Sequence, residues 1–202
     1  MVKVKICGIT NVADALHAAA AGAAAIGLNF YPPSPRCLDP EAARAIVAAL
    51  PPQVCAVGVF VNEARARVAE IARAVGLRAL QFHGDESPAD CRGWPLKVIK
   101  ALRVRDAAAL AAAAAYDVDF VLLDAYVEGQ AGGTGRRFAW ELSAGCDRSR
   151  LILAGGLTPE NVAAAVRLVR PLAVDVASGV ETRPGVKDPE LVRRFIANAQ
   201  TA

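Results

Sequence analysis

Short apolar runs recur along the chain, and stretches with helical periodicity separate most of them. Eight of these runs are rich in β-branched residues and have the length and near-continuous apolar character of buried parallel strands. The pattern therefore predicts a protein built from repeated strand and helix units. The eight expected strands lie at residues 2–7, 24–30, 54–60, 77–83, 96–102, 119–125, 150–155 and 172–178.

Six intervening or terminal stretches carry apolar residues at helical spacing, and several follow a residue that can cap a helix. These expected helices span residues 11–22, 40–50, 63–76, 105–115, 158–169 and 188–199. The expected N-caps are Asn11, Asp39, Asn62 and Thr158, with Pro40 and Pro159 at first helical positions.

Two connections between strands depart from this regular alternation. Residues 84–94 are too few for more than about a turn of helix, and the segment after the sixth strand begins as a long Gly-rich loop. Eight strand and helix units favour a closed barrel over an open sheet. The expected fold is a compact single-domain (β/α)8 TIM barrel over residues 1–202, with a shortened or missing helix after the fourth strand.

Composition and charge exclude several classes of protein. Of the 202 residues, 54% are apolar, which provides a sizeable core and argues against disorder. The formal net charge is +3 and the basic residues are scattered, so nucleic acid is a poor partner. No apolar run reaches the roughly 20 residues of a membrane span and no signal sequence is evident, so we expect a cytoplasmic protein. Five cysteines without a CxxC pair argue against a disulfide framework and a zinc site.

Cys7 and Asp124 each stand where an apolar strand ends and a Gly-containing turn begins. Residues at strand ends face the ligand-binding crevice of a barrel, so a thiol and a carboxyl there are a candidate base and acid. Lys5 shares the strand face of Cys7, which suggests a lowered thiol pKa, whereas apolar walls would favour the neutral form of Asp124. The alternatives are a buried core thiol, and a carboxylate that caps a turn or pairs with Arg136.

Four further side chains have both a functional and a structural interpretation. Arg36 follows a proline-stiffened loop that could present its guanidinium to a carboxylate, although it could also be an ordinary surface residue. His83 ends the fourth strand, where histidine is as often a structural hydrogen bonder. Asp175 interrupts an apolar strand and needs a donor, either Lys5 or a sugar hydroxyl. His17 lies in an Ala-rich helix and is expected to be exposed or packed, without a functional role.

Three late segments have the composition of an anion-binding corner: GQAGGTG, AGGLTPEN and ASGVETRPG. Each follows an expected strand, and Gly lets backbone N–H groups turn toward a ligand. Any one of them could be only a tight turn. Three together at the late strands of a barrel favour a phosphorylated small molecule as the ligand.

The chain contains, in order from the first strand to the last helix, the motifs VKICGIT, NFYPPSPR, VGVFVN, LQFHGDE, VLLDA with GGTGRRFAW, LAGGLTPENV, and VDVASGVE with PGVKD. In these motifs it resembles the phosphoribosylanthranilate isomerase family of tryptophan biosynthesis. The resemblance implies an Amadori rearrangement of N-(5'-phosphoribosyl)anthranilate, with no metal and no cofactor. Family analogy permits a monomer or a homodimer.

The same resemblance implies a role for each matching residue. Asp124 would be the general acid that opens the furanose ring, and Cys7 the general base that removes the C2' proton. Arg36 would bind the anthranilate carboxylate and Asp175 the ribose hydroxyls, with His83 a further substrate contact. The phosphate would be bound by the segments containing Gly133, Thr134, Gly135, Gly156, Ser178 and Gly179.

Two departures from the family pattern are small. Cys37 stands where an aromatic residue is expected, and QFHG replaces a more usual QLHG, which puts substrate affinity rather than identity in doubt. The nearest alternative enzyme is the sugar isomerase of histidine biosynthesis, alone or as a second activity, but that enzyme is expected to use two carboxylates. A non-catalytic phosphate-binding barrel is the alternative from another class.

Overall fold

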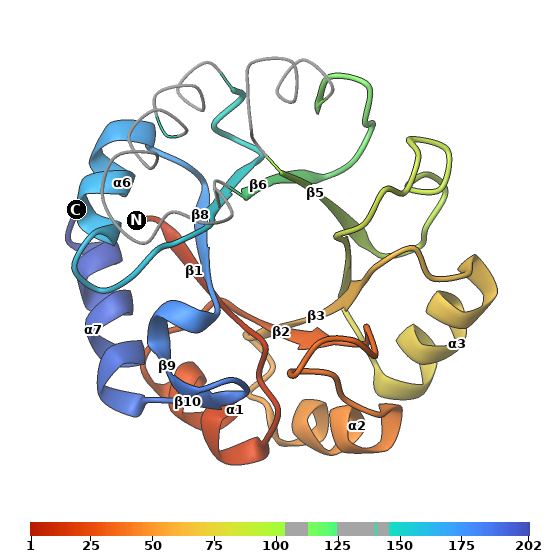
Figure 1. Ribbon diagram of the computed structural model, residues 1–202, viewed down its shortest axis with the longest axis horizontal. Helices are drawn as coiled ribbons and strands as arrows, with labels where there is room; N and C mark the ends of the chain where they lie inside the picture. Colours follow the sequence, from red (N-terminus) through yellow and green to blue (C-terminus); the bar gives the residue numbers. More distant parts are fainter. Residues whose placement is uncertain (104–112, 125–139, 141–145) are drawn as a thin grey trace.

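The computed structural model describes residues 1–103, 113–124, 140 and 146–202. All eight expected strands are present, and they run parallel in chain order (Figure 1). They are β1 (Lys3–Cys7), β2 (Ala25–Asn29), β3 (Cys55–Phe60), β4 (Ala79–Phe82), β5 (Lys97–Arg103), β6 (Phe120–Asp124), β7 (Leu151–Ala154) and β8 (Ala173–Val176). Hydrogen bonds between β1 and β8 close the sheet, so the prediction of a (β/α)8 barrel is confirmed.

The described helices surround the barrel (Figure 1). They are α1 (Val12–Ala20), α2 (Pro40–Ala49), α3 (Arg65–Val75), α6 (Val162–Val169) and α7 (Pro189–Gln200). A short 3-10 helix η1 (Ser178–Val180) follows β8 and leads into an antiparallel hairpin of β9 (Glu181–Arg183) and β10 (Val186–Lys187). Most of the helix expected at 105–115 lies outside the described residues. None of the described helices is long and apolar enough to cross a membrane.

Two of the four expected helix caps are confirmed and two are wrong. Asn11 and Asp39 each accept a hydrogen bond from the backbone N–H three residues later. Helix α3, however, begins after Ala64 and not after Asn62. Asn62 has a left-handed backbone (φ 52°), and its amide oxygen instead accepts from the backbone N–H of Asp85. The residue that resembled a cap thus anchors the connection after β4.

Helix α6 also begins later than the sequence suggests. Thr158 and Pro159 belong to a turn, and the regular helix follows Asn161. The Asn161 side chain holds this turn, because it accepts from the Thr158 N–H (2.8 Å) and donates to the carbonyl of Gly156 (2.9 Å). The expected cap at Thr158 is therefore wrong, and Asn161 instead fixes the loop that leaves β7.

Alternate residues of each strand face the barrel interior or the surrounding helices. The large outer cluster of buried residues includes the apolar faces of the described helices. Four of the eight buried residues of the inner cluster are alanines, which leave interior space for longer polar residues. Its buried members are Val57, Ala79, Ile99, Ala101, Leu122, Ile152, Ala154 and Ala173.

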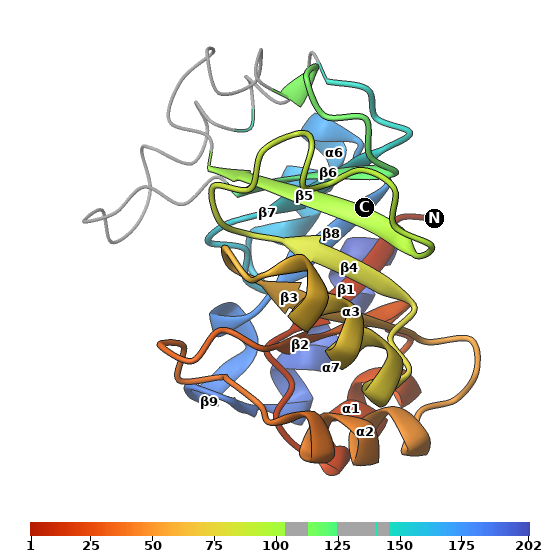
Figure 2. The same ribbon diagram turned by 90° about the vertical axis from the view of Figure 1, so that its right-hand side faces the viewer.

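A buried ion pair occupies the place of a helix between β4 and β5. Residues 83–96, all of them described, form turns and no helix, as predicted (Figure 2). The Lys100 ammonium lies 2.6 Å from Oε2 of Glu86 and 2.7 Å from the carbonyl of Gly84. Glu86 Oε1 also accepts from the backbone N–H of Asn62. These charge-assisted bonds hold the short connection against the outside of the barrel.

Glu86→Ala should lower the free energy of unfolding by about 3 to 5 kcal/mol, because it leaves the Lys100 ammonium buried without its counter-charge. Urea denaturation followed by circular dichroism measures the change. Glu70→Ala, which breaks the exposed Arg67–Glu70 pair, is the control and should leave the unfolding midpoint nearly unchanged. Equal midpoints for the two variants would contradict a structural role for the buried pair.

Candidate active site

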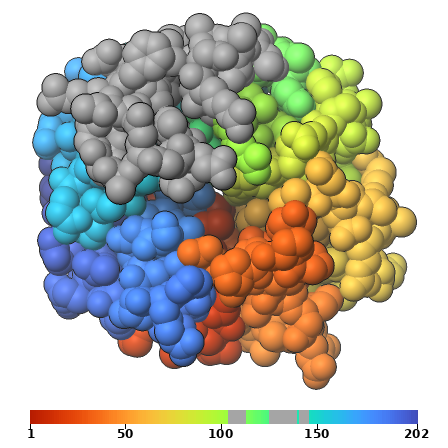
Figure 3. Space-filling model, viewed as in Figure 1, coloured from red at the N-terminus to blue at the C-terminus, as the bar shows by residue number. Residues whose placement is uncertain are grey.

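A cavity of about 240 Å³ opens at the carboxyl ends of the strands. Figure 3 shows it as a hollow bordered by the orange loop after β2 and the blue segment after β8. Every expected site residue within the described part lines this cavity: Cys7, Arg36, His83, Asp124, Asp175, Gly156, Ser178 and Gly179. Gly133, Thr134 and Gly135 lie outside the described residues. The cavity therefore unites residues from β1, β6 and β8 and from the segments after β2, β4, β7 and β8.

Cys7 reaches the cavity because its neighbour on β2 has no side chain. Gly27 pairs with Cys7 in the strand register. A Cβ at Gly27 would lie 2.6 Å from Sγ of Cys7 and 3.1 Å from Nζ of Lys5. The glycine thus allows the thiol and the ammonium to approach each other within the barrel.

Lys5 and Asp175 form a buried ion pair across the seam of the barrel. They face each other in the register of β1 and β8, and Nζ lies 2.9 Å from Oδ1 of Asp175. Burial alone would lower the pKa of Lys5, but the Asp175 carboxylate and the Cys7 thiol raise it above its usual value. Of the two donors considered for Asp175, Lys5 is present in the structure, and Oδ2 is the oxygen that Lys5 does not occupy.

The expectation of a lowered thiol pKa is wrong in direction. Burial raises the pKa of Cys7, the ammonium of Lys5 opposes that rise, and the carboxylate of Asp175 adds to it. The sequence placed Lys5 correctly beside Cys7, but it contained no measure of how little solvent reaches the thiol. Burial thus favours the neutral form of the Cys7 thiol.

Asp124 lies opposite His83 at the mouth of the barrel. Nε2 of His83 is 3.4 Å from Oδ2 of Asp124, whose side chain remains 23% exposed. Nδ1 of His83 is 2.8 Å from Nε2 of Gln81, a fully buried residue on β4. With the amide nitrogen donating to Nδ1, the ring proton lies on Nε2 and faces Asp124. The carboxyl thus has a polar neighbour rather than the purely apolar walls we expected.

Arg36 is fixed by a carboxylate that we did not identify from the sequence. Its Nε and NH2 donate to the two carboxylate oxygens of Glu181, over 2.8 and 2.6 Å. The arginine stem crosses Gly8, where a Cβ would lie 2.4 Å from the Arg36 Cδ. Burial alone would raise the pKa of Glu181, but hydrogen bonds from Arg36 and Lys187 lower it to about 2. Glu181 is thus ionised at neutral pH.

The two described Gly-rich loops touch each other directly. Gly155 and Gly156 have left-handed backbones (φ 86° and 62°), which glycine adopts without strain. A Cβ at Gly179 would lie 2.0 Å from the carbonyl oxygen of Leu157, so only glycine fits there. The loops after β7 and β8 therefore form one continuous edge of the cavity.

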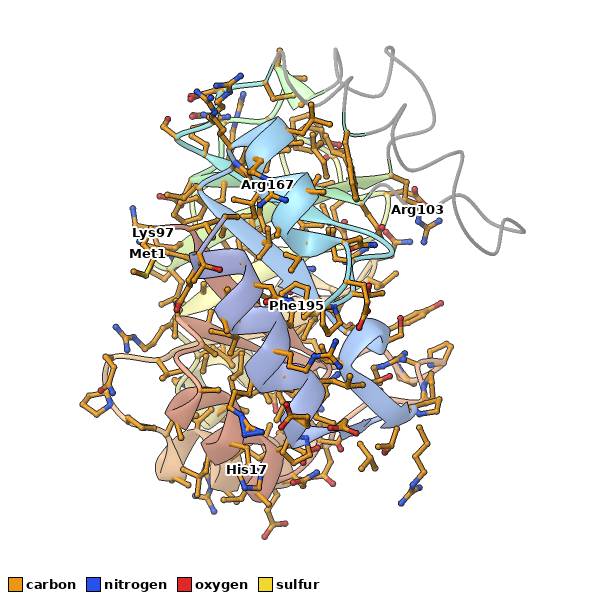
Figure 4. The ribbon with its side chains drawn as sticks, turned by 90° about the vertical axis from the view of Figure 1, so that its left-hand side faces the viewer. Met1, His17, Lys97, Arg103, Arg167 and Phe195 are labelled. Atoms are coloured by element: carbon orange, nitrogen blue, oxygen red, sulfur yellow. The ribbon has the colours of Figure 1, made fainter. Side chains whose placement is uncertain are left out.

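Two other polar side chains of the cavity were overlooked, and His17 is not among the residues that line it. Asn29 and Ser34 line the cavity and are joined by a hydrogen bond of 3.2 Å. Asn29 ends β2, so the strand-end rule that identified Cys7 could have found it. His17 is exposed on α1 (Figure 4). Within the described residues, no group of three His, Cys, Asp or Glu side chains could hold a metal ion.

Comparison with known proteins gives one consistent family. The family model described as N-(5'phosphoribosyl)anthranilate (PRA) isomerase matches residues 4–198. A Pseudomonas fluorescens protein named N-(5'-phosphoribosyl)anthranilate isomerase is 56% identical over 197 residues, which cover 96% of this chain and 94% of that protein. A relative of the same name from Trichlorobacter lovleyi is 52% identical over 204 residues and covers 100% of both.

Solved structures give the same result. The phosphoribosyl anthranilate isomerase from Thermotoga maritima has a TM-score of 0.93 and 46% identity, with 100% of both chains covered. A phosphoribosyl anthranilate isomerase in complex with reduced 1-(o-carboxyphenylamino)-1-deoxyribulose 5-phosphate has a TM-score of 0.89 and 44% identity, again over 100% of both chains.

Lys5→Met should raise the pKa of Cys7 further, because it removes the positive charge that opposes the effect of burial. Alkylation of Cys7, followed by peptide mass spectrometry to separate it from the other four thiols, should then require a higher pH than in the unchanged chain. Lys97→Met, an exposed lysine paired with Asp119, serves as the control. An alkylation midpoint that stays the same in Lys5→Met would contradict the electrostatic role of Lys5.

Proposed function

Since the chain belongs to the N-(5'-phosphoribosyl)anthranilate isomerase family, we propose that Cys7 is the general base of its reaction and Asp124 the general acid. The chain catalyses an aldose–ketose isomerisation in tryptophan biosynthesis, from N-(5'-phosphoribosyl)anthranilate to 1-(2-carboxyphenylamino)-1-deoxyribulose 5-phosphate. The observation that carries the assignment is that the Cys7 thiol and the Asp124 carboxyl line the same cavity at the strand ends.

The first step opens the furanose ring. Asp124 donates a proton to the ring oxygen, the bond between this oxygen and C1' breaks, and the lone pair of the anilino nitrogen forms an iminium with C1'. His83 lies beside Asp124 and is itself oriented by Gln81. We assign His83 to positioning the acid rather than to a direct substrate contact.

The second step removes the proton on C2'. The Cys7 thiolate accepts this proton, the C–H electrons form the C1'–C2' double bond, and the iminium nitrogen recovers its lone pair. The resulting enolamine then becomes the ketone when the C2' hydroxyl loses its proton and C1' gains one. One acid and one base are sufficient for this sequence.

The raised pKa of Cys7 is compatible with its role as a base. A neutral thiol releases its proton to solvent more readily when positive charge develops beside it, and the iminium formed in the first step supplies such a charge. Lys5 provides a second positive charge from below. The base is thus favoured at the stage when the C2' proton has to leave.

Substrate binding follows the remaining cavity residues. Arg36 would bind the anthranilate carboxylate, and Oδ2 of Asp175 would accept from a ribose hydroxyl. Gly156, Ser178 and Gly179 would surround the phosphate, because their loops form one edge of the cavity with glycine conformations suited to close approach. The substrate is therefore a phosphorylated small molecule. The argument against nucleic acid as a partner remains the small net charge and the scattered basic residues of the sequence.

Cys7→Ser and Asp124→Asn should each lower kcat by about 10² or more, because each removes one proton-transfer group. Turnover is followed through the fluorescence of freshly prepared phosphoribosylanthranilate, and circular dichroism verifies folding. Cys146→Ser and Glu70→Gln, outside the cavity lining, are matched controls. Full activity in either test variant would contradict the catalytic role proposed for that residue. An inactive but folded wild-type chain would favour a non-catalytic barrel.

Gly179→Ala should weaken binding of the phosphorylated ligand by about tenfold, because the new methyl group forces the two Gly-rich loops apart. Titration with inorganic phosphate and with reduced 1-(o-carboxyphenylamino)-1-deoxyribulose 5-phosphate measures the loss of affinity. Gly76→Ala, outside the cavity lining at a left-handed glycine (φ 79°) where a Cβ would have its nearest contact at 3.9 Å, controls for a general loss of stability. Equal affinities in the two variants would place the phosphate elsewhere.

A further inference from the structure

Arg36 has a bound carboxylate before any substrate arrives, which raises a problem of charge. If Arg36 and Glu181 were alone, their pair would be neutral, and it would attract a carboxylate only weakly. The assignment of Arg36 to the anthranilate carboxylate, on which this inference rests, therefore needs an additional positive charge. The family resemblance assigns no residue to this additional charge.

Lys187 supplies that charge. Its Nζ lies 2.7 Å from Oε1 of Glu181 and 3.1 Å from the carbonyl oxygen of Ala177. The side chain is only 2% exposed, so solvent screens its charge poorly. Burial lowers the pKa of Lys187, but the hydrogen bond to the ionised Glu181 and the charge of that carboxylate oppose this fall. Since both partners of Nζ are acceptors, Lys187 donates to them as an ammonium. Arg36, Glu181 and Lys187 together thus carry a net charge of +1.

The backbone holds this arrangement independently of the Lys187 side chain. The Lys187 N–H donates to Asp14 of α1 over 2.8 Å, and the Thr10 hydroxyl donates to the carbonyl of Gly185. The hairpin of β9 and β10 is therefore anchored to the segment that follows Cys7. A side-chain substitution at Lys187 can change the charge while these anchors remain.

We propose that Lys187 is a specificity-determining residue, whose pairing with Glu181 leaves the Arg36 cluster with one positive charge in excess for selecting ligands with a carboxylate beside the reacting amine. Glu181 positions the guanidinium through two hydrogen bonds, and Lys187 compensates the negative charge that this positioning introduces. Selectivity for the carboxylated aromatic amine is thus a property of three residues.

The test compares two ligands that differ only in the carboxylate. These are reduced 1-(o-carboxyphenylamino)-1-deoxyribulose 5-phosphate and the same compound without its carboxyl group, each titrated by calorimetry. Lys187→Met should lower the preference for the carboxylated ligand by about tenfold, which corresponds to about 1.4 kcal/mol. Binding of the ligand without a carboxylate should change less than about twofold.

A double variant separates charge from architecture. Lys187→Met combined with Glu181→Gln restores the net charge of +1, so we expect it to recover at least about threefold of the lost preference. Lys97→Met also breaks a lysine–carboxylate pair and is the control. Lys97 begins β5 and Arg103 ends it (Figure 4), so Lys97 lies at the end of the strand away from the cavity, and its substitution should leave the preference unchanged.

Two outcomes would overturn the proposal: equal weakening of both ligands in Lys187→Met, or a double variant less selective than the single one. Both are distinct from failure of the proposed catalytic roles, which is judged by the turnover of Cys7→Ser and Asp124→Asn. Because binding is measured without turnover, the charge cluster and the acid–base pair are tested separately.

Discussion

The ion pair of Lys5 and Asp175 joins the first and last strands of the barrel, and the candidate chemistry is organised around it. Its two members come from β1 and β8, whose pairing closes the sheet. Lys5 lies directly below the thiol of Cys7, while Asp175 faces the same cavity. Closure of the barrel therefore brings together the base, its nearest positive charge and the expected acceptor for the sugar.

This arrangement depends on how little else fills the barrel. Several inner positions are alanine or glycine, so the interior can hold a lysine where larger side chains would exclude it. The same lack of bulk leaves Gly27 beside Cys7, without which the thiol would have to move. The small residues of the inner barrel are thus a condition for the site.

The strand-end rule is the part of the argument that worked from sequence alone. It placed Cys7, His83 and Asp124 at one mouth, because parallel strands of a barrel end on the same face. The Arg36 partner Glu181 could not be found that way, since it comes from a hairpin outside the barrel and contacts Arg36 across 145 positions of sequence. The predicted direction of the Cys7 pKa shift was wrong for a similar reason, because burial is set by packing and not by neighbouring residues in the chain.

Three lysines within the described part are buried, and each is paired with a carboxylate: Lys5 with Asp175, Lys100 with Glu86, and Lys187 with Glu181. Such pairs lose hydration when buried, so they are a weak source of stability compared with apolar residues of similar size. Their positions explain them better. Lys100 replaces a helix, Lys5 supports the thiol, and Lys187 balances the carboxylate that orients Arg36. Each buried pair holds a neighbouring group in a defined position. The pairs of Lys5 and Lys187 hold groups of the cavity, and the pair of Lys100 holds the connection between β4 and β5.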